Sequence, residues 1–425
     1  MFKIFRFLKH KFNRLGPGFI TGAADDDPSG IATYSITGAQ FGYKLGWLSL
    51  FLTPMMITIQ EMCGRIGMVS GMGLAGSIKK YYSRKLLFFA VILLLIANTI
   101  NIGSDLGIMA ASLQMILGLP FLFWLILVTI FTVILEIFVP YDKYSRFLKW
   151  MGLSTLVYGL TAVIVKQEWL SIIRYMLIPH IELNLNYIMT IVACLGTSIS
   201  PYLFFWQTSE QVEEQIKEGK IREFEESPHI IETEIKYMQK DTFFGMIFSN
   251  IIFFFIVITT SATLNRNCIF DIETPQQAAL ALRPLVGDFA FLLFTFGIIG
   301  IGLQAVPVLA GAVAYAISET FGFKEGLAKK LTEAKAFYSV LGFATLIGAL
   351  MNLIGINPIK ALYYTAIVNG VVAVPLIAII IKLADDERVV GNFKSTKLRK
   401  IIAWFTFFFM GLASLLMIIN LIRAK

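Results

Sequence analysis

The sequence predicts an all-helical protein that crosses a membrane many times, and three observations predict this class. Hydrophobic residues make up 57% of the 425 residues, charged residues make up only 15%, and the mean hydropathy is +0.73. These values are far from those of soluble domains. The apolar residues gather in segments long enough to cross a bilayer, and most Lys and Arg residues lie in alternate loops between these segments.

Eleven apolar segments are long enough to cross about 30 Å of hydrocarbon. They lie near residues 15–39, 45–64, 86–110, 117–139, 147–165, 187–208, 241–262, 286–318, 336–354, 359–381 and 399–422. The first and the sixth are interrupted by proline, and the eighth is long enough to tilt or to extend beyond the bilayer. We expect a single transmembrane transport domain over residues 1–425.

The distribution of Lys and Arg predicts the orientation, because cytoplasmic loops carry the excess of these residues. With the N-terminus inside, 28 of the 36 Lys and Arg residues lie in cytoplasmic segments. We therefore expect a cytoplasmic N-terminus and an extracellular C-terminus in a prokaryotic cell membrane. The net charge of +8 follows from this topology and from contact with anionic lipid, so no nucleic-acid partner is expected.

The two interrupted segments point to a function. Asp27-Pro28-Ser29-Gly30 breaks the first segment, and Thr197-Ser198-Ile199-Ser200-Pro201 breaks the sixth. Backbone groups released from a helix at membrane depth need protein, water or an ion as a partner. Breaks at corresponding positions of two halves mark the substrate site of secondary transporters. The sequence therefore predicts a carrier of a small solute.

The charge of Asp27 indicates what the solute is. A carboxylate near mid-bilayer needs a partner, and no Lys or Arg lies between Arg14 and Lys44 to supply one. The C-terminal ends of the two half-helices add partial negative charge at the breaks. One carboxylate with carbonyl, hydroxyl and water oxygens suits a hard divalent cation such as Mg²⁺ or Mn²⁺.

Each break also has a purely structural explanation. Asp27-Pro28 is also a good helix start, in which case Asp25 and Asp26 would lie at the membrane surface. Ser200-Pro201 alone could be a simple proline kink.

Polar residues in other spans are weaker candidates. Asp105 lies in a polar stripe of the third span with Asn98, Asn101 and Ser104. We expect the charged Asp105 to face a cavity. Interhelical hydrogen bonding explains the Asn residues about as well as a functional role does. Glu61 lies near an inner span end, where an ion-paired or snorkelled role is expected.

The broken segments resemble a known family. Gly16-Pro17-Gly18 leading to Asp27-Pro28-Ser29-Gly30 is similar to the first-span Asp-Pro-Gly-Asn motif of the natural resistance-associated macrophage protein (NRAMP) family of divalent-metal transporters, and Ser200-Pro201-Tyr202 resembles its sixth-span Met-Pro-His. The resemblance implies the LeuT-like fold. Two inverted five-helix repeats, about 15–166 and 187–382, would precede an eleventh helix at about 397–423.

The departures from the family motif imply a changed metal site. The expected metal-binding positions are Asp27, Ser29, Gly30, Thr197 and Ser200. The resemblance places Gly30 where the family has Asn and Ser200 where it has Met, and it places the carbonyl ligand on Thr197. Smaller groups without sulfur would enlarge the site and suit a partly hydrated ion, as in the NRAMP-related magnesium transporters, a divergent branch.

The proton-coupling positions also differ. Aligned on Asp105, the third span carries Asn98 and Ile108 where the family has acidic residues, and the sixth-span histidines become Tyr202 and Gln207. We assign Asp105, Tyr202 and Gln207 to the ion pathway. Since no group there titrates near neutral pH as histidine does, transport without proton coupling is expected.

The expected function is alternating-access import of divalent metal ions, Mg²⁺ most of all and also Mn²⁺, by a protein that is not an enzyme and uses no cofactor. The alternatives are a proton-coupled Mn²⁺/Fe²⁺ importer of the ordinary kind and a LeuT-like carrier of an organic solute. A channel or a receptor is disfavoured, because no pore-lining charge ring and no sensor domain is visible. The expected partners are the ion and membrane lipid, and a monomer would suffice.

Overall fold

A computed structural model describes residues 16–139 and 155–423, and within these ranges the protein is built from helices and contains no strand. The elements, in order, are α2 (Pro17–Asp25), α3 (Pro28–Phe41), η1 (Gly42–Leu45), α4 (Leu48–Ser70), α5 (Leu74–Tyr81), α6 (Arg84–Leu117), α7 (Phe121–Phe138), α9 (Leu156–Ile164), α10 (Trp169–Leu177), α11 (Leu185–Ser198), α12 (Pro201–Lys217), α13 (Glu232–Thr263), η3 (Asn265–Asn267), α14 (Pro275–Ala279), η4 (Leu280–Leu282), α15 (Arg283–Val286), η5 (Gly287–Phe289), α16 (Ala290–Phe321), α17 (Lys335–Met351), η6 (Asn352–Ile354), α18 (Pro358–Asp385), α19 (Glu387–Val390) and α20 (Lys397–Arg423).

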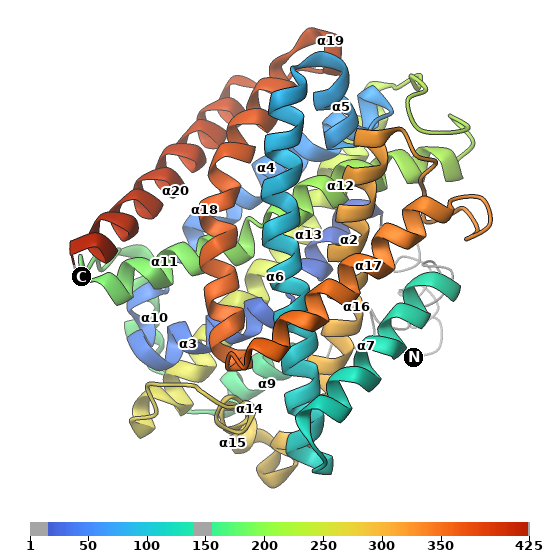
Figure 1. Ribbon diagram of the computed structural model, residues 1–425. Coiled ribbons are helices and arrows are strands. Elements are labelled where there is room, and N and C mark those ends of the chain that lie inside the picture. Colours follow the sequence, from blue (N-terminus) through green and yellow to red (C-terminus); the bar gives the residue numbers. More distant parts are fainter. Residues whose placement is uncertain (1–15, 140–154, 424–425) are drawn as a thin grey trace, which may run out of the picture.

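The long helices run between two ends of the molecule (Figure 1). The short helices α5 and α19 lie at one end, which we call the α19 end, and α14 and α15 lie at the opposite end, which we call the α14 end (Figure 1). The helix α6 packs on α16, α17 and α18, and α20 lies on the outside against α11 and α18.

Eight helical stretches of the described chain are long and apolar enough to cross a membrane. Three of the eleven expected spans are not among these eight stretches, each for a different reason. The first is split between α2 and α3, and the second, α4, carries buried polar and charged side chains such as Gln60 and Glu61. The fifth lies partly outside the described residues, which resume at Thr155 before α9.

Both breaks predicted from proline are present. The helix α2 ends at Asp25 and α3 restarts at Pro28, while α11 ends at Ser198 and α12 restarts at Pro201. Proline favours the first helical position because it has no N–H to leave unpaired there and its φ is already helical. The chain therefore interrupts each helix and begins it again within three residues.

The first half-helix, α2, packs against α13 with almost no space between the backbones. A side-chain carbon added at Gly22 would overlap the backbone of Gly245, and one added at Gly18 would overlap Thr242. Small residues permit this close approach of membrane helices. The position of α2 therefore depends on α13.

A carboxylate of α13 also holds the start of α2. Asp241 accepts hydrogen bonds from the backbone N–H groups of Gly16 (3.0 Å), Gly18 (2.7 Å) and Phe19 (3.2 Å). The first N–H groups of a helix have no partner within the helix, and a negative charge there is favoured by the helix dipole.

We predict that Asp241→Ala lowers the unfolding free energy by about 1–3 kcal/mol, because hydrogen bonds to a charged acceptor are lost at a mostly buried position. The measurement is the thermal unfolding midpoint of the detergent-purified protein. Asp241→Asn is the matched control, since it keeps one acceptor oxygen and should lose less. An unchanged midpoint for Asp241→Ala would show that this carboxylate does not stabilise α2.

A buried carboxylate joins three helices at the α19 end. Glu61 of α4 is ion-paired with Arg65 and with Arg399 of α20 (3.4 Å), and it accepts a hydrogen bond from Gln239 of α13 (3.2 Å). Arg65 in turn donates to the carbonyl of Phe393 (2.6 Å). The expected ion-paired role of Glu61 is confirmed, although its side chain is buried rather than at the surface.

Candidate metal centre

Asp27 lies in the first break, where its side chain caps α3. Its Oδ1 accepts a hydrogen bond from the Gly30 N–H (2.7 Å), and its Oδ2 accepts one from Asn101 Nδ2 of α6 (3.0 Å). The residue is 2% exposed. The break therefore holds this carboxylate inside the protein, with two hydrogen bonds that fix its orientation.

The second break supplies neutral oxygens. The Ser200 hydroxyl donates to the carbonyls of Gly196 (2.7 Å) and Thr197 (2.9 Å), which belong to the last turn of α11. The Thr197 hydroxyl has no hydrogen-bond partner among the described residues, and both side chains are buried. Carbonyl and hydroxyl oxygens are thus concentrated at the C-terminal end of α11.

Gly30 brings the two breaks together. A Cβ at this position would lie 3.3 Å from the Thr197 Oγ1 and 3.6 Å from the Asp25 carbonyl oxygen. The position is therefore closely packed by Thr197 and also by the Tyr34 ring, whose Cε2 would lie 3.3 Å from such a Cβ. An amide side chain at position 30, as in the family motif, would require these neighbours to move.

Ser29 is placed differently from the other expected positions. Its hydroxyl donates to the carbonyl of Leu362 in α18 (3.1 Å). This hydrogen bond ties α3 to α18. The Ser29 hydroxyl therefore supports helix packing.

Asp25 and Asp26 are buried, so the structural alternative that placed them at the membrane surface is wrong. Their exposed fractions are 0% and 3%. The Ser249 hydroxyl of α13 lies within hydrogen-bond distance of both, at 2.5 Å from Asp25 Oδ2 and 3.3 Å from Asp26 Oδ1. One oxygen of each carboxylate has no hydrogen-bond partner among the described residues. The first break therefore carries two more buried carboxyl groups than the Asp27 motif alone implies.

The three residues assigned to the ion pathway contact different helices. Asp105 of α6 is 0% exposed, and neither of its carboxylate oxygens has a hydrogen-bond partner among the described residues. The Tyr202 hydroxyl donates to the Ala24 carbonyl at the end of α2 (2.9 Å). Gln207 lies against α4, where its Nε2 is 3.1 Å from the position of a Cβ on Gly64.

Asn101 is a contact that sequence analysis did not single out. Its amide donates to Asp27, while Asn98, one turn earlier on α6, donates to the Leu309 carbonyl of α16 (2.9 Å). Ser104 is paired with Thr365 of α18 (2.9 Å). The polar stripe on α6 was visible in the sequence, but only the folded structure distinguishes the member that contacts Asp27 from those that join helices.

The described residues contain no group of three or more His, Cys, Asp and Glu side chains arranged to hold a metal ion. The breaks instead offer the Asp27 carboxylate on one side and the carbonyl and hydroxyl oxygens of Thr197 and Ser200 on the other. Such a set binds hard cations that keep part of their water shell.

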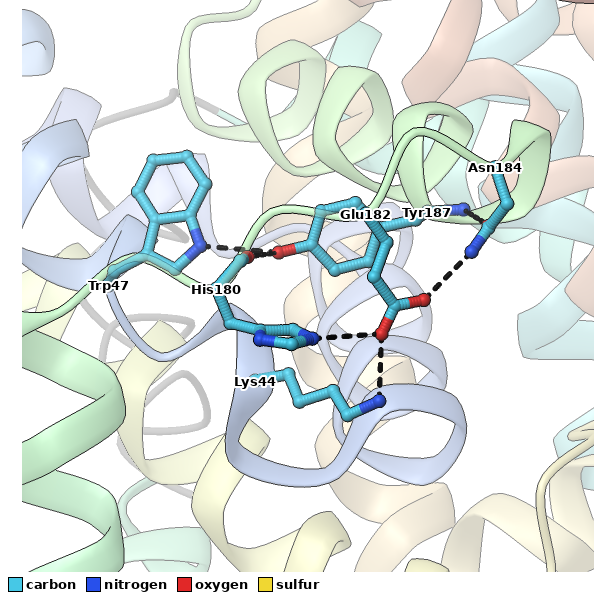
Figure 2. Close-up of polar contacts among 6 residues, drawn as sticks. All are labelled: Lys44, Trp47, His180, Glu182, Asn184 and Tyr187. Carbon is cyan, nitrogen blue, oxygen red and sulfur yellow. Dashed lines mark hydrogen bonds and ion pairs between the residues drawn. The ribbon is translucent and has the colours of Figure 1, made fainter.

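A polar cluster lies at the α14 end, between the ends of α3 and α11 (Figure 2). Glu182 contacts Lys44 Nζ (2.7 Å), His180 Nε2 (3.1 Å) and Asn184 Nδ2 (2.8 Å). Lys44 follows α3 and Asn184 precedes α11. Hydrogen bonds from Lys44 and then His180 hold the pKa of Glu182 below its usual value. The cluster joins the ends of the two half-helices that lie farthest from the breaks.

Comparison with known proteins identifies the family. A sequence model described as natural resistance-associated macrophage protein-like (Nramp) matches residues 18–420. The chain belongs to this family. Nramp proteins are metal transporters rather than enzymes, and the metal is their substrate rather than a cofactor.

Relatives of similar length are distant in sequence. Proteins described as divalent metal cation transporter MntH, from Listeria welshimeri and from Nostoc, are 22% and 24% identical to this Nramp chain. The alignments cover 96% and 92% of this chain and 90% and 86% of the relatives.

Solved structures agree on the fold. The manganese transporter of Eremococcus coleocola has a TM-score of 0.73 at 16% identity, covering 97% of this chain and 87% of that one. Mhp1, a nucleobase-cation-symport-1 family transporter, has a TM-score of 0.58 at 12% identity, with coverage of 96% and 90%. The expected LeuT-like fold of this Nramp protein is confirmed. The repeat boundaries near 15–166 and 187–382 stay predictions.

Proposed function

We propose that this protein imports divalent metal ions into the cytoplasm by alternating access, with Mg²⁺ preferred and Mn²⁺ also carried. The observation that carries the proposal is the meeting of the two breaks, where the Asp27 carboxylate lies in one break and the Thr197 and Ser200 oxygens lie in the other. The ion would bind between the breaks, and the two ends of the molecule would open to it in turn.

The orientation is part of the proposal. Lys and Arg residues are concentrated in the loops of the α19 end, so this end is assigned to the cytoplasm and the α14 end to the outside. The membrane is then the cell membrane, with the N-terminus inside and the C-terminus outside.

The ligand chemistry of the two breaks favours Mg²⁺. Ser200 and Gly30 offer neither a thioether nor an amide at the breaks, and the nearest polar group to the Gly30 side-chain position is the Thr197 hydroxyl. Soft ligands select transition metals, while Mg²⁺ dehydrates reluctantly and is bound through few protein oxygens and several waters. A site that offers oxygen ligands and no sulfur favours the hard ion that keeps part of its water.

The second candidate is a proton-coupled Mn²⁺ or Fe²⁺ importer. It is favoured by the structural likeness to a protein described as a manganese transporter. Ion uptake into proteoliposomes, with Mg²⁺, Mn²⁺ and Ca²⁺ compared and an internal pH dye present, separates the two. Mg²⁺ uptake without a pH change supports the first candidate, and Mn²⁺ uptake without Mg²⁺ uptake supports the second.

Substitution at position 200 should change ion selectivity. We predict that Ser200→Met shifts preference from Mg²⁺ toward Mn²⁺ and Cd²⁺, because a thioether is added and space is removed. Competition among these ions for uptake is the measurement. Ser200→Leu is the matched control, as it fills a similar volume without sulfur and should reduce uptake without favouring Cd²⁺. Equal selectivity of the Met variant and the wild type would show that position 200 does not face the ion.

A further inference from the structure

An open cavity of about 440 Å³ lies at the α14 end. It is lined by Gln40, Phe41, Asn184, Leu185, Asn186, Phe270 and Asp271. These residues come from the end of α3, the start of α11 and the segment between η3 and α14. Because α3 and α11 each have 14 residues and lead to the breaks, the cavity lies about 21 Å from the metal centre along both helices.

Asp271 is the one acidic side chain that lines this cavity, and it forms no direct ion pair. Four other carboxylates described at the α14 end are each paired with a base: Glu168 with Arg266 (2.7 Å), Glu182 with Lys44 (2.7 Å), Glu273 with Lys360 (2.7 Å) and Asp288 with Arg283 (3.1 Å). Asp271 instead has a long hydrogen bond from Gln40 Nε2 to its Oδ1 (3.4 Å). Among the described acidic residues of this end, Asp271 alone forms no ion pair within 4 Å, although the ammonium of Lys360, which pairs with Glu273, is near enough to interact with it.

The cavity favours a cation over an anion. The N-terminus of α11 could attract an anion, but Asn184 already caps it by accepting from the Tyr187 N–H (2.9 Å) and donates its own amide to Glu182 (Figure 2). The C-terminal end of α3, whose carbonyls carry partial negative charge, faces the same cavity at Phe41. The fixed charge of the cavity is therefore negative.

We propose that this cavity captures a hydrated divalent cation before the ion reaches the metal centre. The proposal rests on the proposed function, in which ions arrive from the α14 end. Six waters occupy about 180 Å³ at their liquid volume, so a hydrated ion fits without losing its shell. Asp271 attracts the ion, and the amide oxygens of Gln40 and Asn186 accept hydrogen bonds from its waters. A single carboxylate keeps binding weak enough for the ion to move on.

Capture and transport can be separated by kinetics. For Asp271→Asn in proteoliposomes, we expect the KM for Mg²⁺ and Mn²⁺ to rise about threefold or more with an unchanged maximal rate, because charge steering accelerates association. The KM of the wild type should also rise more with ionic strength than that of the variant, since salt screens the lost attraction. Glu168→Gln is the matched control, since Glu168 is paired with Arg266 outside the cavity, and its KM should stay unchanged. An unchanged KM for Asp271→Asn overturns the capture site.

A binding measurement keeps this result distinct from failure of the proposed function. In the purified Asp27→Ala protein, which lacks the carboxylate of the metal centre, electron paramagnetic resonance should detect one weak Mn²⁺ site that disappears when Asp271→Asn is added. Wild-type vesicles that take up no divalent ion would contradict the proposed function, while this weak site would still support capture. If the Asp271 variants keep the weak Mn²⁺ site and the wild-type KM while wild-type vesicles take up divalent ions, the capture site alone is contradicted.

Discussion

Asp27→Ala is expected to abolish divalent-ion uptake while leaving the protein folded in the membrane. The carboxylate lies inside the first break, and its hydrogen bonds from Gly30 and Asn101 orient it without neutralising its charge. Attraction between unit charges about 4 Å apart is about 4 kcal/mol at the effective dielectric of a protein, which is roughly a thousandfold in affinity. Mg²⁺ and Mn²⁺ uptake into proteoliposomes is the measurement.

The control for this substitution is Asp288→Ala, which removes an exposed, ion-paired carboxylate at the α14 end. It should leave uptake unchanged. Size-exclusion chromatography of both variants in detergent establishes that they are folded. Near-normal uptake by a folded Asp27→Ala protein would remove Asp27 from the metal centre and with it the proposed function.

Transport is expected to proceed without proton movement. In the third span, Asn98 donates a hydrogen bond to a backbone carbonyl of α16. In the sixth span, the Tyr202 hydroxyl donates one to the end of α2. Asp105 is buried without hydrogen-bond partners in the described chain, so no hydrogen bond among these residues passes from it to a second titrating group. The inside-negative potential alone contributes about 4.6 kcal/mol per 100 mV for two charges.

Uptake in proteoliposomes should therefore follow an imposed potential, with no acidification of the lumen. An internal pH dye read beside metal influx makes the measurement, and clamping the potential at zero is the control. Acidification that tracks metal influx and disappears in Asp105→Asn would show coupling. The chain would then be a proton-coupled importer.

The positions of both breaks could be predicted from sequence because proline both ends a helix and starts the next one. Pro28 and Pro201 are the first residues of α3 and α12. The Asp27 cap follows from the same local rule, since Asp before a helix accepts an N–H of its first turn.

Other features of the metal centre depend on contacts between distant segments. Asn101 reaches Asp27 from α6, and Ser249 reaches Asp25 from α13, across 74 and 224 residues of sequence. The direction of the Ser29 hydroxyl depends on how α18 packs against α3. No local pattern distinguishes Asn101 from Asn98 or a surface Asp from a buried one, because each outcome is decided by the neighbouring helix.

The Glu61 cluster has a consequence for how mutational effects combine. One carboxylate is shared by Arg65, Gln239 and Arg399, so changing any of them alters the environment of the other two. Free-energy changes add for independent sites and fail to add within one network. The helix α20 is therefore not separable from the rest of the protein, since the contribution of Arg399 to stability is defined only with α4 and α13 in place.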